Sequence, residues 1–276
     1  MNARKMAGRW FNFTRKTGGW RCHRLINKLI MIKPLFLALG LWCFSSLSAQ
    51  SITSTDQFLT ALHQKYKGRM PKTISFTQET TFFKADTISG KQTWYEYSEF
   101  PDNFRIVFGE PANRNTVIYA RDTVYNIKAG KLSSKRYGRN NLMLTSGGWV
   151  YLSKEEVLNR LTEDGYKTDK FHEDTWNGRK VYVIGADKGD TTSKQVWVDK
   201  EYFYAVRVFE TFPNGVAFEG HLSRQIKIGD AWIETHCEFF TKGKIFQMED
   251  YREVKWNIPF EKDLFDPLAN ITTQNP

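Results

Sequence analysis

The chain has 276 residues and a formal net charge of +10, a balance that by itself is typical of proteins that bind nucleic acid or an anionic surface. The excess lies in residues 1–33, which are rich in Lys and Arg and contain no acidic residue, whereas residues 50–276 carry nearly equal numbers of bases and acids. The charge therefore gives no support for nucleic-acid binding by the main part of the chain.

The N-terminal region has the features of an export signal. An apolar run, PLFLALGLWCF (34–44), follows the basic segment and precedes the small residues of SSLSAQ. We therefore predict a signal peptide over residues 1–49, cleaved between Ala49 and Gln50, and an exported mature protein.

Three alternatives bear on this region. Retention of the run as an anchor is disfavoured because it is shorter than the roughly 20 residues that span a bilayer. A lipoprotein signal is disfavoured because Trp42 stands where a small residue should precede Cys43. A start at Met31 would also give a complete signal peptide, in which case residues 1–30 are a mis-assigned extension.

Cys237 is the one cysteine beyond the predicted cleavage site, so no internal disulfide can form there. The fold must then be held by its own core, for which residues 50–276 are long enough. Because no repeat, Pro-rich linker or low-complexity tract interrupts this part, we predict a single domain over 50–276.

Two helices are expected in chain order. The first covers about 54–67, where Ser54 and Gln57 fit a capping box, and the second covers about 153–164, where Ser153 and Glu156 fit another. The apolar segment before the second helix, NLMLTSGGWVYL (141–152), has no clean period. We interpret it as a loop or short helix that covers something.

The rest of the chain alternates apolar and polar residues as strands do. In NFRIVFGEP, Phe104, Ile106 and Phe108 share one face, with Arg105 and Val107 on the other. Further strands are expected as a hairpin over 116–132 with a second turn at 129–130, as three strands over 179–211, and as three or four over 214–257. Turns recur roughly every 8–12 residues, which favours an antiparallel meander of one sheet.

The sequence gives no reason to expect an enzyme, a metal site or a cofactor. No metal-binding, nucleophile or phosphate-binding motif is present, and the histidines of this part stand singly: His63, His172, His221 and His236. Asp187 and Asp190 suggest a cation site less well than a solvated hairpin turn, because no third acid lies at the required spacing.

Aromatic residues are abundant, and they leave two interpretations open. They either pack into an ordinary core or line a cavity that is kept open for an apolar ligand.

Several segments in order resemble one family. They are ISFTQ (74–78), SGKQTWYEY (89–97), DNFRIVFGEP (102–111), VWVDKEYFYAVRVFE (196–210) and LFDP (264–267). Together they resemble the periplasmic outer-membrane lipoprotein carrier family, the LolA-type proteins.

The resemblance implies a mainly β fold with a few helices: an incomplete antiparallel β-barrel, or strongly curved sheet, whose helices form a lid over a hydrophobic cavity. It implies a periplasmic carrier of lipoprotein acyl chains or another lipid, a monomer that meets an inner-membrane donor and an outer-membrane acceptor. The alternative is a periplasmic lipid-sensing or adaptor domain that binds a membrane protein. Carried over by position, the cavity residues are Phe76, Trp94, Phe104, Ile106, Phe108, Met143, Leu144 and Trp149.

One position departs from the family pattern. Well-studied members place an Arg directly before the Pro of this strand pair, where it ties the lid shut, whereas here Phe100 precedes Pro101. Two explanations stay open: the lid is held differently, or the cargo is not a triacylated lipoprotein.

Overall fold

The computed structural model describes residues 51–212 and 214–271, which belong to one compact unit, Gln50–Pro276. The predicted signal peptide, its cleavage site and the alternative start at Met31 lie outside the described residues. Among the helices of the described part, none combines the length and the apolar character that crossing a membrane requires.

Thirteen antiparallel strands form one sheet in the order β6-β5-β4-β3-β2-β1-β15-β14-β11-β10-β9-β8-β7. Its first half consists of β1 (Thr73–Lys84), β2 (Thr87–Glu99), β3 (Asn103–Phe108), β4 (Thr116–Ala120), β5 (Thr123–Lys128) and β6 (Lys131–Tyr137). Its second half consists of β7 (Lys167–Trp176), β8 (Arg179–Gly185), β9 (Gln195–Asp199), β10 (Ala205–Thr211), β11 (Ala217–Ser223), β14 (His236–Thr241) and β15 (Lys244–Trp256). A separate hairpin is formed by β12 (Ile226–Ile228) and β13 (Ala231–Ile233).

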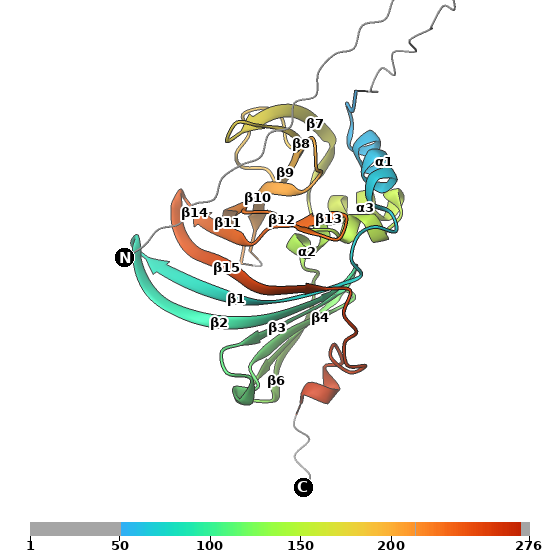
Figure 1. Ribbon diagram of the computed structural model, residues 1–276. Helices are drawn as coiled ribbons and strands as arrows, with labels where there is room; N and C mark the ends of the chain where they lie inside the picture. The colour runs from blue at the N-terminus through green and yellow to red at the C-terminus, as the bar shows by residue number, and fades with distance from the viewer. Residues whose placement is uncertain (1–50, 213, 272–276) are drawn as a thin grey trace, which may run out of the picture. The chain divides into compact units, whose positions relative to one another are not determined.

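The two halves of the sheet join where the first strand pairs with the last, with Ile74 opposite Trp256. The sheet is strongly curved and stays open, with β6 and β7 as its edges (Figure 1). The mainly β fold with a strongly curved antiparallel sheet is thereby confirmed. We expected a single meander, in which each strand pairs with the next in the chain. The sheet instead consists of two such runs, joined where β1 pairs with β15.

Two strand predictions were incomplete. β7 was not anticipated, since KTDKFHEDTW is rich in charge, as an edge strand that faces solvent can be. Residues 214–257 contain five strands instead of three or four, because the short β12–β13 hairpin leaves the main sheet.

The two long helices begin at the predicted caps. In α1 (Thr55–Tyr66), the Ser54 hydroxyl accepts from the Gln57 amide at 3.2 Å, while the Gln57 side chain bonds the Thr53 amide instead of that of Ser54. In α3 (Lys154–Glu163), the Ser153 hydroxyl accepts from the backbone amide three residues on at 3.1 Å. Each side chain thus satisfies an amide that the first turn leaves unpaired.

The segment 141–152 folds as a short helix, α2 (Asn141–Thr145), followed by the 3-10 turn η2 (Gly148–Tyr151). Between them Gly147 has φ +146°, a conformation that side chains rarely adopt. The other 3-10 turns are η1 (Pro111–Asn113) and η3 (Leu268–Asn270).

The largest core cluster extends from Phe76 and Phe104 on the first half of the sheet to Val208 on the second, and part of it lies under α1. Phe58 is fully buried and its ring lies 5.8 Å from Trp149, 6.0 Å from Tyr182 and 5.4 Å from Phe203. These edge-on and tilted contacts fix α1 and η2 against β8 and the turn after β9. The first half of the sheet is covered instead by α2 and the β12–β13 hairpin, which lie between the two halves (Figure 1).

Candidate functional site

A cavity of about 120 Å³ lies between the inner face of the first half of the sheet and α2. The sheet supplies side chains from four adjacent strands, among them Phe76, Trp94, Phe104, Ile106, Glu249 and Tyr251. The cover consists of α2 with its flanks and the end of β13, through Asn140, Leu142, Met143, Ser146, Ile233 and Glu234. We call α2 together with Asn140 and Ser146 the α2 cover.

Strand register explains which side chains face the cavity. Glu96 on β2 lies opposite Phe76 on β1 and opposite Ile106 on β3, so the three form one row across the sheet. Successive side chains of a strand point to opposite faces. Arg105 therefore lies on the outer face, where its guanidinium donates to the Leu264 carbonyl at 2.9 Å.

Five of the predicted cavity residues line this cavity: Phe76, Trp94, Phe104, Ile106 and Met143. They come from three neighbouring strands and from α2, so the structure brings together residues that are up to 67 positions apart in the chain. Their role in holding a ligand remains a prediction.

The other three predicted residues are placed differently. Phe108 is not among the lining residues, although its ring contacts Trp94 edge-on with centroids 4.9 Å apart. Trp149 is buried beneath α1 and lines a different cavity, because η2 turns away after Gly147. Leu144 belongs to α2, and its side chain lies outside the described part of the structure.

Three glutamates also line the cavity, and all are buried. Glu249 accepts from Tyr251 Oη at 2.9 Å and from Gln247 Nε2 at 2.6 Å, and Glu234 accepts from Ser146 Oγ at 3.0 Å. Glu96 is 5% exposed and has neither a hydrogen-bond nor an ion-pair partner among the described residues. An apolar cavity with an unpartnered carboxyl in its wall is unusual, because such a group loses its hydration without compensation.

Burial governs the protonation of these groups. It raises the pKa of Glu96 well above the usual value, and the neighbouring Glu249 and Glu234 raise it further. Burial also raises the pKa of Glu249 to about 7, against the opposing effect of its hydrogen bonds. The pKa of Glu234 is raised by burial as well, while its backbone amide and Ser146 oppose the shift. The cluster therefore holds protons near neutral pH.

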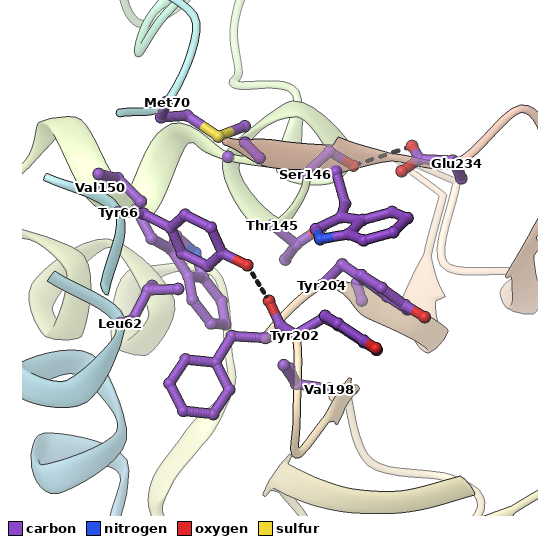
Figure 2. A pocket seen from close by; sticks show the side chains of 16 residues that line it. Leu62, Tyr66, Met70, Thr145, Ser146, Val150, Val198, Tyr202, Tyr204 and Glu234 are labelled. Carbon is purple, nitrogen blue, oxygen red and sulfur yellow. Dashed lines mark hydrogen bonds between the residues drawn. The ribbon is translucent and has the colours of Figure 1, made fainter. Parts of the chain in front are cut away.

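The α2 cover is fastened to carboxylates at both ends. Ser146 donates to Glu234, as Figure 2 shows, and Asn141 Nδ2 donates to Glu210 Oε1 at 3.2 Å. Both bonds join the cover to strands of the second half of the sheet or to the β12–β13 hairpin. Few polar contacts thus hold a five-residue helix over the cavity.

The position that departs from the family pattern has a structural counterpart. Phe100 is 2% exposed and stacks on Tyr151 of η2, with ring centroids 5.8 Å apart. Two residues later, Asp102 Oδ1 lies 2.5 Å from the Nη1 atom of Arg160 in α3. The turn between β2 and β3 is thus tied to a helix by an ion pair in which the turn supplies the acid and the helix supplies the arginine.

A second cavity lies on the other side of the α2 cover, between α1 and the turn after β9 (Figure 2). It is lined by aromatic side chains that include Tyr66, Tyr202 and Tyr204, and the Tyr66 hydroxyl donates to the Tyr202 carbonyl. Its volume of about 30 Å³ suits one water molecule and not an alkyl chain.

The three glutamates were not predicted as cavity residues, although alternation along two of the strands indicates their position. In WYEYS (94–98), Trp94, Glu96 and Ser98 alternate, so a prediction that places the tryptophan in the cavity also places the acid there. The same holds for Gln247, Glu249 and Tyr251. What alternation does not reveal is which face of each strand is covered.

The groups considered for catalysis or metal binding have structural partners instead. Within the described ranges, no cluster of His, Cys, Asp or Glu side chains is arranged to hold a metal ion. His221 lies 2.6 Å from Glu219, and His236 lies 2.8 Å from Asp250. Asp190 caps its hairpin turn by accepting from the Thr192 amide at 2.7 Å, as expected for a turn.

No protein-family model and no curated protein matches the chain. Among solved structures, a domain from Vibrio parahaemolyticus described as an outer membrane lipoprotein-sorting protein is 13% identical to this chain, with a TM-score of 0.51. The match covers 77% of this chain and 97% of that domain. A DUF1329 family protein from Desulfovibrio piger is 15% identical with a TM-score of 0.48, over 78% and 97%. A LolA superfamily protein from Nitrosomonas europaea is 14% identical with a TM-score of 0.48, over 78% and 98%.

At these identities the likeness concerns the fold alone, and it rests on the Vibrio parahaemolyticus domain, which has the highest TM-score of the three. The curved sheet and its helical cover thus have the LolA-type fold, as the resemblance in sequence predicts.

Proposed function

We propose that the protein is a periplasmic carrier that takes up lipoprotein acyl chains, or those of another lipid, in the cavity under the α2 cover. It would receive them from an inner-membrane donor and deliver them to an outer-membrane acceptor. The observation that carries this proposal is a cavity whose wall is mostly apolar and which is closed by a short helix with few polar contacts. The fold shared with a lipoprotein-sorting domain supports it.

The cavity is small in this closed conformation. A volume of about 120 Å³ is close to that of apolar cavities that accept a single benzene-sized guest, so it holds only a few methylene groups. A complete acyl chain requires the α2 cover to move away from the sheet. The Gly147–Gly148 joint behind α2 provides a place where the backbone can rotate.

The energetics of a carrier favour such a cover. Burial of a 16-carbon chain stabilises the bound state by on the order of 12 kcal/mol, whether the chain enters a protein or a bilayer. A carrier must nearly match the membrane in affinity without exceeding it. Displacing Met143 and the polar contacts of α2 opposes binding and brings the two affinities closer.

The test is the binding of a fluorescent fatty-acyl probe, combined with native mass spectrometry of protein isolated from the periplasm. Ile106→Trp fills the cavity from the middle of β3, and we expect it to weaken probe binding at least about tenfold. Leu132→Trp on β6, an exposed position away from the cavity, is the matched control and should bind like the wild type.

Recovery of the protein without lipid or lipoprotein, together with no uptake of the probe, would contradict the proposal. So would equal binding by Ile106→Trp and wild type at unchanged thermal stability. A stoichiometric membrane-protein partner without lipid exchange between vesicles would favour the adaptor alternative instead.

A further inference from the structure

The Glu96 carboxyl is a buried acid without a partner in the wall of an apolar cavity. On either side of it in the sheet stand Phe76 and Ile106, neither of which can donate a hydrogen bond. Among the described residues, none donates to it or pairs with it. A buried polar group without a partner calls for an explanation, and a contact supplied by a bound ligand is one.

The ionisable side chains in the described cavity wall are acids, with no base among them. Glu234 and Glu249 face it together with Glu96, and none of the described lining residues is basic. Glu234 and Glu249 already accept hydrogen bonds from Ser146, Gln247 and Tyr251, so their oxygens are partly used. The carboxyl that is left for a ligand is that of Glu96.

We propose that the cavity selects an amphiphile whose head group is an ammonium, with Glu96 as its direct partner. The carboxyl groups of Glu234 and Glu249 lie around the head as further acceptors, while Phe76, Phe104 and Ile106 contact the first methylene groups of the alkyl chain. This inference rests on the proposed function, because it names the class of lipid that the carrier accepts.

The alternatives fit the wall less well. An anionic head would find no basic side chain among the described lining residues, so its buried charge would stay uncompensated, which disfavours phosphate and carboxylate. A metal ion needs several oxygens converging on one point, and no such arrangement exists among the described residues. A neutral alcohol would satisfy Glu96 through one hydrogen bond but would gain nothing from Glu234 and Glu249. An ammonium has three donors and the complementary charge.

Proton release is a second signature of this site. Burial and mutual repulsion keep protons on the cluster while the cavity is unliganded. A bound ammonium stabilises the ionised form of Glu96, which then loses its proton to solvent. Besides Glu96, the titratable groups near it are Glu234, Glu249, Tyr119, Tyr251 and Cys237, and burial raises the pKa of each of the last three above its usual value.

The experiment compares dodecylamine, dodecanol and dodecanoate at pH 7, three probes with the same chain and different heads. We expect dodecylamine to bind at least about tenfold more tightly than dodecanol, and dodecanoate to bind most weakly. Calorimetry in two buffers of different ionisation enthalpy should show protons released with dodecylamine and none with dodecanol.

Glu96→Gln keeps the shape of the side chain and removes its charge. We expect it to abolish the preference for the amine and to reduce the proton release, while dodecanol binding stays within about twofold. Glu253→Gln, an exposed acid on the same strand as Glu249, is the control and should keep the preference. A thermal melt of each variant separates loss of binding from loss of folding.

The outcomes separate a failure of this inference from a failure of the proposed carrier function. Equal binding of all three probes, or an unchanged amine preference in Glu96→Gln, would overturn the assignment of Glu96 and leave the carrier proposal standing. Failure of every probe to bind, with no lipid recovered from the isolated protein, would overturn both. A twofold or smaller amine preference in the wild type also counts against the inference.

Discussion

The Ser146 hydroxyl donates a 3.0 Å hydrogen bond to the Glu234 carboxylate, and so joins the end of the α2 cover to the β12–β13 hairpin. Glu234 is at the same time one of the three acids of the cavity wall. Opening of the cover removes a donor from Glu234, which favours the protonated form of that carboxyl. The position of the cover and the charge of the cavity are therefore linked.

The first prediction concerns this bond. Ser146→Ala leaves the buried Glu234 carboxylate without its side-chain donor, and we expect it to lower the free energy of unfolding by about 1 kcal/mol. The fluorescent acyl probe should dissociate several-fold faster, because the closed cover loses one of its two fastenings. Stopped-flow displacement of the probe measures this rate. Ser134→Ala on β6, which removes an exposed hydrogen bond donated by Asn126 of β5, should change neither quantity. An unchanged dissociation rate in Ser146→Ala would show that the bond does not hold the cover.

The second prediction concerns the ion pair between the β2–β3 turn and α3. A double-mutant cycle of Asp102→Ala and Arg160→Ala should give a coupling energy of about 1–2 kcal/mol in urea unfolding, since both side chains are largely shielded from solvent. The exposed pair Lys91–Glu79 should give less than about 0.5 kcal/mol in a parallel cycle. Equal coupling in both cycles would contradict a fastening role for Asp102 and Arg160.

The third prediction concerns the joint behind the cover. A Cβ at Gly147 would overlap the end of the Met70 side chain, and its φ of +146° disfavours any other residue. Gly147→Ala should lower the free energy of unfolding by about 1–3 kcal/mol. Adding Met70→Ala removes the overlap but not the backbone strain, so it should not restore wild-type stability. Gly90→Ala on β2, where no atom lies within 4 Å of the new Cβ, is the control and should be nearly neutral. Full tolerance of Gly147→Ala would mean that this backbone conformation is not required.

The fourth prediction concerns pH. The folded state raises the pKa of Glu249 to about 7, mainly through burial. A carboxyl with a raised folded-state pKa favours folding below its unfolded value, and this contribution is lost as the pH rises through the folded value. The free energy of unfolding of the wild type should therefore fall between about pH 4.5 and pH 7. The pKa values of Glu96 and Glu234 are raised as well, so these groups also lower stability as the pH rises.

Glu249→Gln retains an oxygen for Tyr251 and cannot ionise. We expect it to be more stable than the wild type at about pH 8, by on the order of 2–3 kcal/mol, with a flatter pH profile. Glu253→Gln should retain the wild-type profile. Denaturant melts across this pH range provide the measurement. A wild-type stability that rises from pH 5 to pH 8 would have the opposite sign and contradict the raised pKa.

Much of the local structure was predictable because its causes are local. Ser54 and Ser153 mark the two long helices since a hydroxyl at that position satisfies an amide of the first turn, whatever surrounds it. Alternation placed Phe104 and Ile106 on one face of β3 and Arg105 on the other. The charged edge strand β7 was missed, because its alternation is weak where neither face is well buried.

The site was predictable only in part. Alternation grouped Phe104 and Ile106 with Phe108, and the family resemblance added Phe76 and Trp94. Of these five residues, all but Phe108 line one cavity. Trp149 was assigned to the same cavity because the family resemblance placed it with Met143 in one lid-like segment. The turn at Gly147 sends the two residues to opposite sides of the cover, and nothing in the local pattern indicates that turn direction.

By itself, the sequence determined the helices, most of the strands and the faces of those strands, since caps, turns and a period of two act over a few residues. The tertiary structure alone decided that Glu96, Glu234 and Glu249 meet around one cavity. They come from β2, from the end of the β12–β13 hairpin and from β15, and only the pairing of β1 with β15 and the folding of the hairpin over the sheet bring them together. Contacts between such distant segments depend on many side chains at once, so no short stretch of the chain predicts them.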